Sequence, residues 1–307
     1  MKKTTTAHTM AIAWQILLLL LVMTASFLSA AEPAATKKLS VWVGILPQAY
    51  FVERIGDDLV DIGVLIGPGQ SHEMFDPTPR DIAQLSRSDV YFEIGLPFEQ
   101  RLMQRIAAMN PRFNPVNTIQ GITLRQSESG DTPAAADSAE GPDPHTWLNP
   151  ILVKIEARHI CDALKRLDST QAAEFETNYT AFARDLDRVD STIASILAPF
   201  AGSVIYVYHP AFGYFTDRYH LRQVAVEQEG KEPGAEQLGA LIAQARRDKA
   251  GTIFAEREYS EKTAEAVARE IGARVVILDP LARDYLNNLI QMATTIRDEL
   301  SRRDVGK

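Results

Sequence analysis

The chain has 307 residues, of which 46% are hydrophobic and 23% are charged, and its formal net charge is −8. This balance suits one large or two medium globular domains and excludes collagen-like, disordered and disulfide-framework proteins. The negative charge also argues against nucleic acid as a partner, because an acidic surface repels a polyanion.

The first 31 residues have the pattern of a cleavable signal peptide. Lys2 and Lys3 form a short positive region, and residues 11–25 are almost wholly apolar. Small residues then lead to an expected cleavage point after Ala31. A membrane anchor is the alternative reading, since the apolar run of about 18 residues is borderline for spanning a bilayer. The polar stretch that follows favours cleavage.

Cysteine usage indicates the compartment. Cys161 is the only cysteine in the chain, so no intramolecular disulfide can form. No cysteine stands at the expected cleavage point to carry a lipid anchor. We therefore expect a soluble protein exported to a Gram-negative periplasm.

The first half of the mature chain, residues 32–168, alternates β-rich runs with helical runs. The predicted strands lie at 39–46, 61–66, 89–94 and 113–116. The predicted helices between them lie at 48–55, 78–86 and 97–109. Strands that alternate with helices favour a parallel sheet covered on both faces.

Residues 169–199 carry the clearest helical signal and divide the chain. Their apolar side chains recur at spacings of three and four, which places them on one helix face: Phe175, Tyr179, Phe182, Leu186, Val189, Ile193 and Ile196. Residues 168–170 supply candidate N-caps, and Pro199 should end the helix. A helix of roughly 28 residues would reach about 42 Å. A coiled-coil partner could use the same stripe, but we favour a buried, rigid connection between two lobes.

The second half, residues 200–307, repeats the alternation. Its predicted strands lie at 203–208, 223–226, 252–255 and 275–278, and its helices at 211–219, 235–249 and 261–271.

One segment of the first half differs from the rest of the chain. Residues 126–143 are rich in Ser, Ala, Gly, Pro and acidic residues, which predicts a mobile surface loop.

Three of the six histidines stand where ligands are usually placed. His72 follows a predicted strand and a Gly-Pro-Gly turn, and His209 ends another strand. His145 lies four residues before Asn149, and Asn149 and Pro150 should begin a helix and hold its loop in place. The remaining histidines have settings that suit packing or solvent exposure better.

Asp279 also ends a predicted strand, at the edge where open α/β sheets bind their ligands. A single histidine at a strand end is more often structural, and Asp279 could simply begin a turn. Together, however, three imidazoles and one carboxylate could converge between the halves. Such a donor set suits a divalent metal of intermediate softness.

In these segments the chain resembles the metal-specific solute-binding proteins of zinc and manganese ABC importers. The matching segments occur in the family's order over nearly all the mature chain: GPGQSHEMFDPTPRD, DPHTWLNP, HPAFGYF, EGKEPGAEQL, FAEREYS and LDPL. The resemblance implies an α/β fold with two lobes, each a four-stranded parallel sheet flanked by helices. It also implies one long rigid connecting helix and a metal site in the interlobe cleft.

The resemblance further implies that the metal ligands are His72, His145, His209 and Asp279. Histidine rather than glutamate at position 209 favours Zn2+, with Mn2+ as the alternative. Zinc-type members often carry a histidine-rich loop before the second ligand, whereas residues 126–143 contain no histidine. The acidic residues of this loop are more typical of a solvated surface than of a metal scavenger.

Three further carboxylates are candidates for orienting the imidazoles. Asp143 stands two residues before His145, while Glu227 and Glu256 end or follow predicted strands. Metal-bound imidazoles usually donate their second ring N–H to such groups. The alternative is that these carboxylates pair with arginines such as Arg257.

The sequence therefore predicts a monomeric periplasmic protein, not an enzyme, that captures zinc and delivers it to a membrane ABC permease. A zinc hydrolase is the rival hypothesis, with Glu256 as its base. Against it, Asp279 would fill the position that a catalytic water needs, and no HExxH motif is present. An adhesin that keeps the fold finds no support in the sequence.

Overall fold

The structure, a computed structural model, describes most of the chain, namely residues 37–113, 115–126, 141–227, 234–259 and 261–305. The predicted signal peptide (1–31) and residues 127–140 of the predicted acidic loop (126–143) lie outside the described residues. Lys38–Lys307 forms one compact unit. In the part of the chain that is described, no helix combines the length and apolar character needed to cross a membrane.

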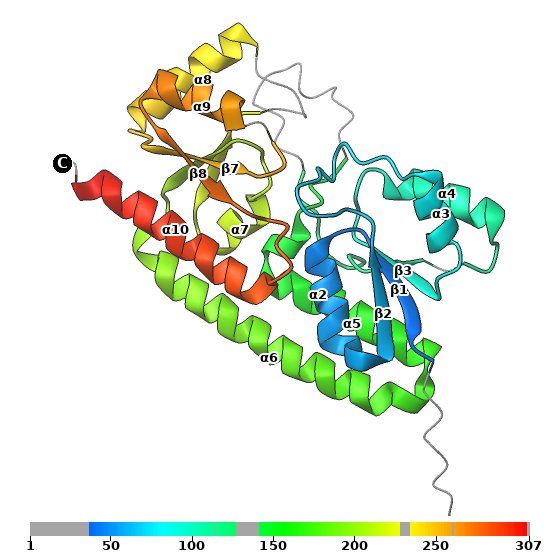
Figure 1. The fold of residues 1–307 in the computed structure, drawn as a ribbon. Coiled ribbons are helices and arrows are strands. Elements are labelled where there is room, and N and C mark those ends of the chain that lie inside the picture. Colours follow the sequence, from blue (N-terminus) through cyan, green and yellow to red (C-terminus); the bar gives the residue numbers. More distant parts are fainter. Residues whose placement is uncertain (1–36, 114, 127–140, 228–233, 260, 306–307) are drawn as a thin grey trace, which may run out of the picture. The chain divides into compact units, whose positions relative to one another are not determined.

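The first half builds a parallel four-stranded sheet in the order β2-β1-β3-β4 (Figure 1). Its strands are β1 (Leu39–Val43), β2 (Val60–Val64), β3 (Val90–Glu93) and β4 (Val116–Asn117). Helices connect successive strands: α2 (Leu46–Gly56), α3 (Pro79–Leu85) and α4 (Glu99–Met109). The central strand β1 buries Val41 and Val43 completely, as expected for a strand paired on both edges and covered by helices.

Two predicted boundaries in this sheet were wrong. The apolar run at 39–46 predicted one strand, but β1 ends at Val43 and α2 begins at Leu46. Pro47 accounts for the change, because proline fits the first turn of a helix and cannot donate to a strand ladder. The fourth strand is also shorter and later than the predicted strand at 113–116.

The second half builds a parallel sheet in the equivalent order, β6-β5-β7-β8. Its strands are β5 (Val204–Val207), β6 (Arg222–Ala225), β7 (Thr252–Glu256) and β8 (Arg274–Leu278). The connecting helices are α7 (Gly213–Arg218), α8 (Ala235–Arg247) and α9 (Glu261–Ile271). The predicted fold class, with two flanked four-stranded parallel sheets, is confirmed.

The predicted long helix between the halves is α6 (Ala172–Leu197), which has 26 residues. It follows α5 (Pro150–Leu167) and a short turn, and it gives way to a 3-10 turn containing Pro199. Most of its apolar stripe is fully buried, and α6 packs against α2 and α5. One apolar core accordingly includes residues of both sheets, while a smaller cluster lies under α8 and α9.

Helix α10 (Tyr285–Val305) was missed by the sequence analysis. It has 21 residues and packs against α6 (Figure 1). Its buried residues recur at helical spacing: Leu289, Met292, Ala293, Ile296 and Leu300. The periodic signal was therefore present after the last predicted strand.

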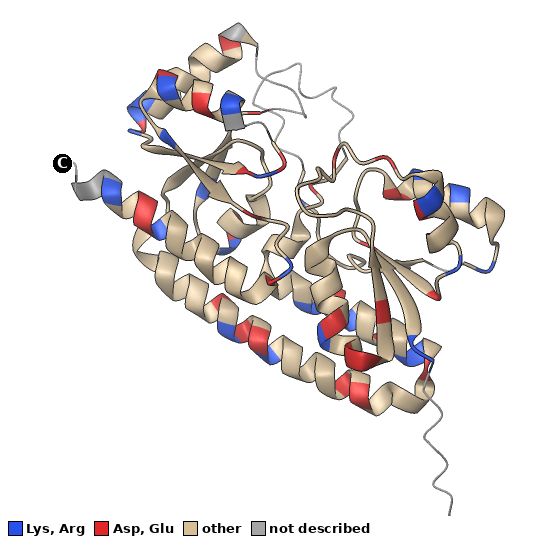
Figure 2. Ribbon diagram, in the orientation of Figure 1, with Lys and Arg blue, Asp and Glu red and all other residues tan. Residues whose placement is uncertain are grey.

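The exposed face of α6 carries acidic and basic residues close together (Figure 2). Asp185 lies 2.5 Å from Arg54 of α2, and Asp187 lies 2.7 Å from Lys154 of α5. Pairs of this kind close to the surface contribute about 1 kcal/mol or less each. The position of α6 therefore depends chiefly on its buried apolar stripe.

Candidate metal centre

The three predicted histidines converge from separate segments of the chain. His72 lies in the loop between β2 and α3, and His209 lies two residues after β5. His145 caps a short 3-10 helix, Thr146–Leu148, that precedes α5. The predicted cap on α5 is confirmed, since the Asn149 side chain accepts a hydrogen bond from the N–H of Ile151 at 2.9 Å.

The imidazoles form a compact and buried group. One ring nitrogen from each of His72, His145 and His209 lies within 4.8 Å of the others. The Nε2 atoms of His72 and His145 are 3.0 Å apart. Each of the three residues is only 3% exposed. Two ligands of one tetrahedral zinc ion have nitrogens about 3.4 Å apart, given Zn–N bonds near 2.0–2.1 Å. The distance between the Nε2 atoms of His72 and His145 is close to this value.

Asp143 contacts both the ring and the backbone of His145. Its Oδ1 atom lies 2.8 Å from His145 Nδ1 and accepts the backbone N–H of the same residue at 2.9 Å. This contact places a proton on Nδ1 and leaves Nε2 directed at the neighbouring imidazoles. The expectation that Asp143 orients His145 is consistent with this geometry.

Trp147 connects two imidazoles to the second half of the chain. Its ring lies 5.0 Å from that of His145 and 5.7 Å from that of His72, measured between centroids. Its indole N–H donates to the carbonyl of Pro280 at 2.9 Å. The Tyr285 hydroxyl in turn donates to the carbonyl of Trp147 at 2.6 Å. The loop after β8 is therefore tied to the residues that follow His145.

His209 lies among carboxylates. Its Nε2 is 3.4 Å from Glu73 Oε1, and its Nδ1 is 3.5 Å from Glu227 Oε2. The ring of Tyr259 stacks on the imidazole, with centroids 4.8 Å apart. Among the described residues, the His209 nitrogens and the buried carboxylate oxygens of Glu227 and Glu256 have no hydrogen-bond partner. Burying polar atoms without partners costs free energy. The lone pairs of these oxygens and nitrogens could bind a cation instead.

The surroundings move the pKa values of these groups in opposite directions. Burial, and then the neighbouring imidazoles, hold the pKa of His72 well below its ordinary value. Burial alone would lower the pKa of His209, but the adjacent carboxylates of Glu227, Glu73 and Glu256 raise it overall. Burial raises the pKa of Glu256 to about 8, and the charge of His209 opposes this rise.

Asp279 follows β8 as predicted, but it is not part of the imidazole group in the described arrangement. Its Oδ1 accepts the N–H of Leu281 at 3.0 Å, and its Oδ2 lies 3.9 Å from Nε of Arg257. The side chain is 33% exposed. The role of Asp279 as a ligand therefore stays a prediction.

The other histidines and the cysteine of the described chain lie in surroundings that suit a structural role. His159 lies with its Nε2 2.9 Å from the carbonyl of Gln120. His220 is exposed and has a positive φ of 58° at the end of α7. Cys161 is buried, and this burial is the main reason that the pKa of its thiol is raised to about 11. Such a thiol packs as a small apolar group.

An interlobe contact around Arg125 was not foreseen. Its backbone N–H donates to the Tyr214 hydroxyl, which donates to the Asp143 carbonyl, both at 2.9 Å. Its guanidinium pairs with Asp217 of α7 and lies 3.6 Å from Asp143 Oδ2. A side chain at Gly213 would collide with this arrangement, because its Cβ would lie 2.6 Å from Arg125 Nε. The segment HPAFGYF therefore contains His209 and also contacts Asp143.

The sequence analysis also passed over Glu73 and Tyr259. Glu73 directly follows His72, and the Tyr259 hydroxyl donates to Glu73 Oε2 at 2.8 Å. Both residues belong to segments already singled out, SHEMFDPTPRD and FAEREYS. Nothing in the one-dimensional pattern indicated that the two segments meet.

Comparison with known proteins agrees with the geometry. A family model described as zinc-uptake complex component A, periplasmic, matches residues 41–299. The high-affinity zinc uptake system protein ZnuA of Bacillus subtilis is 28% identical over 259 residues, or 80% of this chain and 79% of that protein. A crystal structure of ZnuA is 37% identical with a TM-score of 0.79, covering 85% of this chain and 99% of that one.

A zinc-bound deletion mutant of ZnuA is 36% identical with a TM-score of 0.78, covering 85% of this chain and 97% of that one. The matched family region includes both sheets except the first two residues of β1, together with α6 and all three convergent histidines. The resemblance noted in the sequence is therefore confirmed. This chain belongs to the family of periplasmic zinc-uptake complex component A proteins.

Proposed function

We propose that this protein binds one zinc ion through His72, His145 and His209 and delivers it to a membrane ABC permease for import. The observation that carries the proposal is the convergence of three buried imidazoles from three separate segments. Relatives described as zinc-uptake proteins and a zinc-bound relative support the same cargo. The family is one of uptake components rather than enzymes.

The donor set favours zinc on chemical grounds. Imidazole nitrogens suit ions of intermediate softness, whereas manganese sites are richer in oxygen. Asp279 is proposed as the fourth ligand, which requires its carboxylate to come closer to the imidazoles than in the described arrangement. In the described arrangement Glu73 offers a nearer carboxylate to His209.

Three carboxylates are proposed to orient the ligands. Asp143 acts on His145 through the direct 2.8 Å contact, and Glu227 faces Nδ1 of His209. Glu256 lies at the end of β7, and its charge interacts with His209. Such groups set the tautomer and the direction of the ring, which strengthens metal binding.

We further propose that residues 1–31 are a cleaved signal peptide and that the mature protein is a periplasmic monomer without a lipid anchor. Residues 32–168 and 200–307 would then contribute ligands from either side, with 169–199 as their connection. N-terminal sequencing and the native mass of the exported protein test this arrangement. A mature protein that retains its leader, or a stable dimer, would contradict it.

Two experiments test the function. Protein exported to the periplasm without added metal should contain zinc as its dominant element, and manganese instead would overturn the choice of cargo. The variant with His72, His145 and His209 all changed to Ala should lose zinc on dialysis, while His159→Ala, the matched control, keeps it. Retention by the triple variant would remove the basis of the proposal.

A further inference from the structure

Two carboxylates adjoin the three-imidazole group on one side. Glu73, His209 and Glu227 each offer an atom within 4.8 Å of the others, so they form a second potential ligand set that shares His209. In the described residues this set does not merge with His72 and His145 into a single larger group. The two sets are therefore neighbouring positions around one imidazole.

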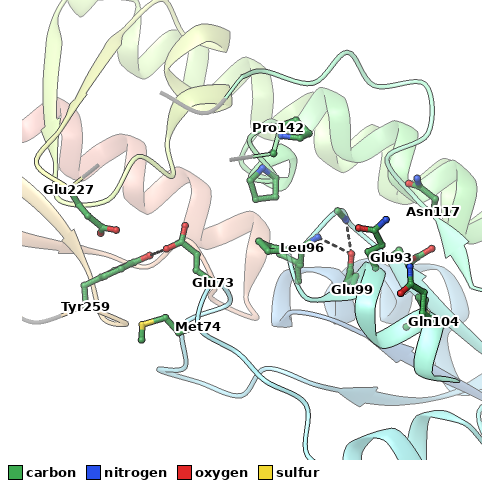
Figure 3. A pocket seen from close by; sticks show the side chains of 16 residues that line it. Glu73, Met74, Glu93, Leu96, Glu99, Gln104, Asn117, Pro142, Glu227 and Tyr259 are labelled. Atoms are coloured by element: carbon green, nitrogen blue, oxygen red, sulfur yellow. Dashed lines mark hydrogen bonds between the residues drawn. The ribbon is translucent and has the colours of Figure 1, made fainter. Parts of the chain in front are cut away.

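The two carboxylates of the second set, Glu73 and Glu227, line a pocket of about 950 Å³. Figure 3 shows Glu227 and Glu73 on the same side of this pocket, and the Tyr259 hydroxyl donates a hydrogen bond to Glu73. Met74, which is 86% exposed, also lines it, so the pocket communicates with solvent. The imidazoles of His72, His145 and His209, in contrast, do not line it. A cation arriving through this pocket meets the carboxylates first.

Glu227 supplies an independent sign of a ligand. Its side chain is only 4% exposed, yet neither carboxylate oxygen has a hydrogen-bond partner among the described residues. The 3.5 Å separation from His209 Nδ1 allows an ion pair without hydrogen-bond geometry. Burial of a carboxylate without hydrogen bonds costs free energy, and a bound cation lowers that cost. Glu73, by comparison, is 29% exposed and oriented by Tyr259.

We propose that Glu73, Glu227 and His209 form an outer position for the divalent cation, through which it reaches and leaves the three-imidazole position. This inference rests on the proposed function, because the cation is the same cargo. Only one cation is held at a time, since both positions use the imidazole of His209. Two oxygens and one nitrogen bind zinc less tightly than three nitrogens do, so the cation proceeds inward.

The first test isolates the outer position at equilibrium. The variant His72→Ala/His145→Ala should still bind one Zn2+ by calorimetry, about 100-fold or more weaker than the unaltered protein, because oxygen-rich sites hold zinc less well. Adding Glu73→Gln should weaken this residual binding a further tenfold or so, since one of three donors is lost. Adding Glu93→Gln instead is the matched control, because Glu93 lines the same pocket outside the ligand set. It should leave the residual binding unchanged.

The second test uses the kinetics of the otherwise unaltered protein. Glu73→Gln should slow Zn2+ association and dissociation by a similar factor of about ten, since loss of a steering carboxylate affects the path and not the endpoint. Affinity would then stay nearly constant. Glu93→Gln should change neither rate. Stopped-flow mixing with Zn2+, and with a chelator for release, measures both.

The outcomes separate this inference from the proposed function. If the unaltered protein binds Zn2+ tightly but the residual binding of His72→Ala/His145→Ala is indifferent to Glu73→Gln, the outer position does not exist. A loss of affinity in Glu73→Gln at an unchanged association rate would also overturn it, because Glu73 would then be a ligand of the endpoint. If His72→Ala/His145→Ala binds as tightly as the unaltered protein, the proposed function itself fails.

Discussion

Asp143 contacts His145 twice through one oxygen atom, accepting the backbone N–H at 2.9 Å and lying 2.8 Å from Nδ1 of the ring. Changing Asp143 to Ala frees the imidazole to rotate and to change tautomer. We expect zinc affinity to fall about 10- to 100-fold, as for other groups that orient metal ligands. Competition with a chromogenic chelator measures this, and Asp187→Ala on the exposed face of α6 is the control. Unchanged affinity in Asp143→Ala would show that the ring is held by its packing alone.

Gly213 offers a test of the Arg125 contact. The Cβ of Gly213→Ala would lie 2.6 Å from Arg125 Nε and 3.0 Å from Asp143 Oδ2, so one of these groups must move. Since Asp143 is proposed to orient His145, zinc affinity should drop about tenfold. Gly239→Ala is the matched control, because nothing lies within 4 Å of its Cβ in α8. That control should keep its affinity and gain about 0.5–1 kcal/mol of stability. Equal affinities in the two variants would contradict the expectation.

Trp147 should report the arrival of the metal. Its ring lies 5.0 Å from His145 and 5.7 Å from His72, whereas Trp42 lies in β1 of the first sheet. Zinc bound to these imidazoles changes the local charge, so the emission of Trp147 should change with it. The change should vanish in Trp147→Phe and persist in Trp42→Phe when zinc is titrated. The reverse pattern would place the metal elsewhere.

Zinc binding should release a proton near neutral pH. His72 has a lowered pKa and is already neutral there, whereas the carboxylates around His209 raise its pKa above 6.5. The proton displaced is therefore that of His209, and affinity should decrease as pH falls through its pKa. Calorimetry in two buffers of different ionisation enthalpy counts the proton. Glu227→Gln, which removes a charge that raises this pKa, should release less. Heats that do not depend on the buffer would refute the assignment.

Glu156 of α5 should make the metal-free protein less stable as pH rises. Burial raises its pKa to about 7, although the Thr146 hydroxyl donates to Oε1 at 2.8 Å. The folded state therefore binds a proton that the unfolded state has lost above its pKa of 4.5. The free energy of unfolding decreases as pH rises from 4.5 to 7, by up to about 3 kcal/mol from this group. Below pH 4.5 the group contributes no pH dependence.

Glu156→Gln tests this directly, because it resembles the protonated form at every pH. Denaturant unfolding should show a variant more stable than the parent by about 2–3 kcal/mol at pH 8 and nearly equal to it at pH 4. A constant difference between the two pH values would mean that the ionisation of Glu156 is not the cause. The metal must be removed first, since bound zinc adds its own stabilisation.

Much of the architecture could be predicted because it depends on local periodicity. The stripe from Phe175 to Ile196 lies on one face of α6, and the alternating runs form two parallel sheets in equivalent order. Where local signals conflicted, as at 39–46, the prediction was wrong because Pro47 favours a helix start over a longer strand. Helix α10 was missed although its apolar spacing was readable.

By itself, the sequence determined the residue types of the candidate metal centre and the placement of His209 and Asp279 at the carboxyl ends of strands. This was possible because parallel strands bring those ends to one edge. It could not determine which carboxylates face the imidazoles. That depends on how loops from both sheets pack, so only the tertiary structure brought Glu73 and Glu227 to His209 and left Asp279 beside Arg257.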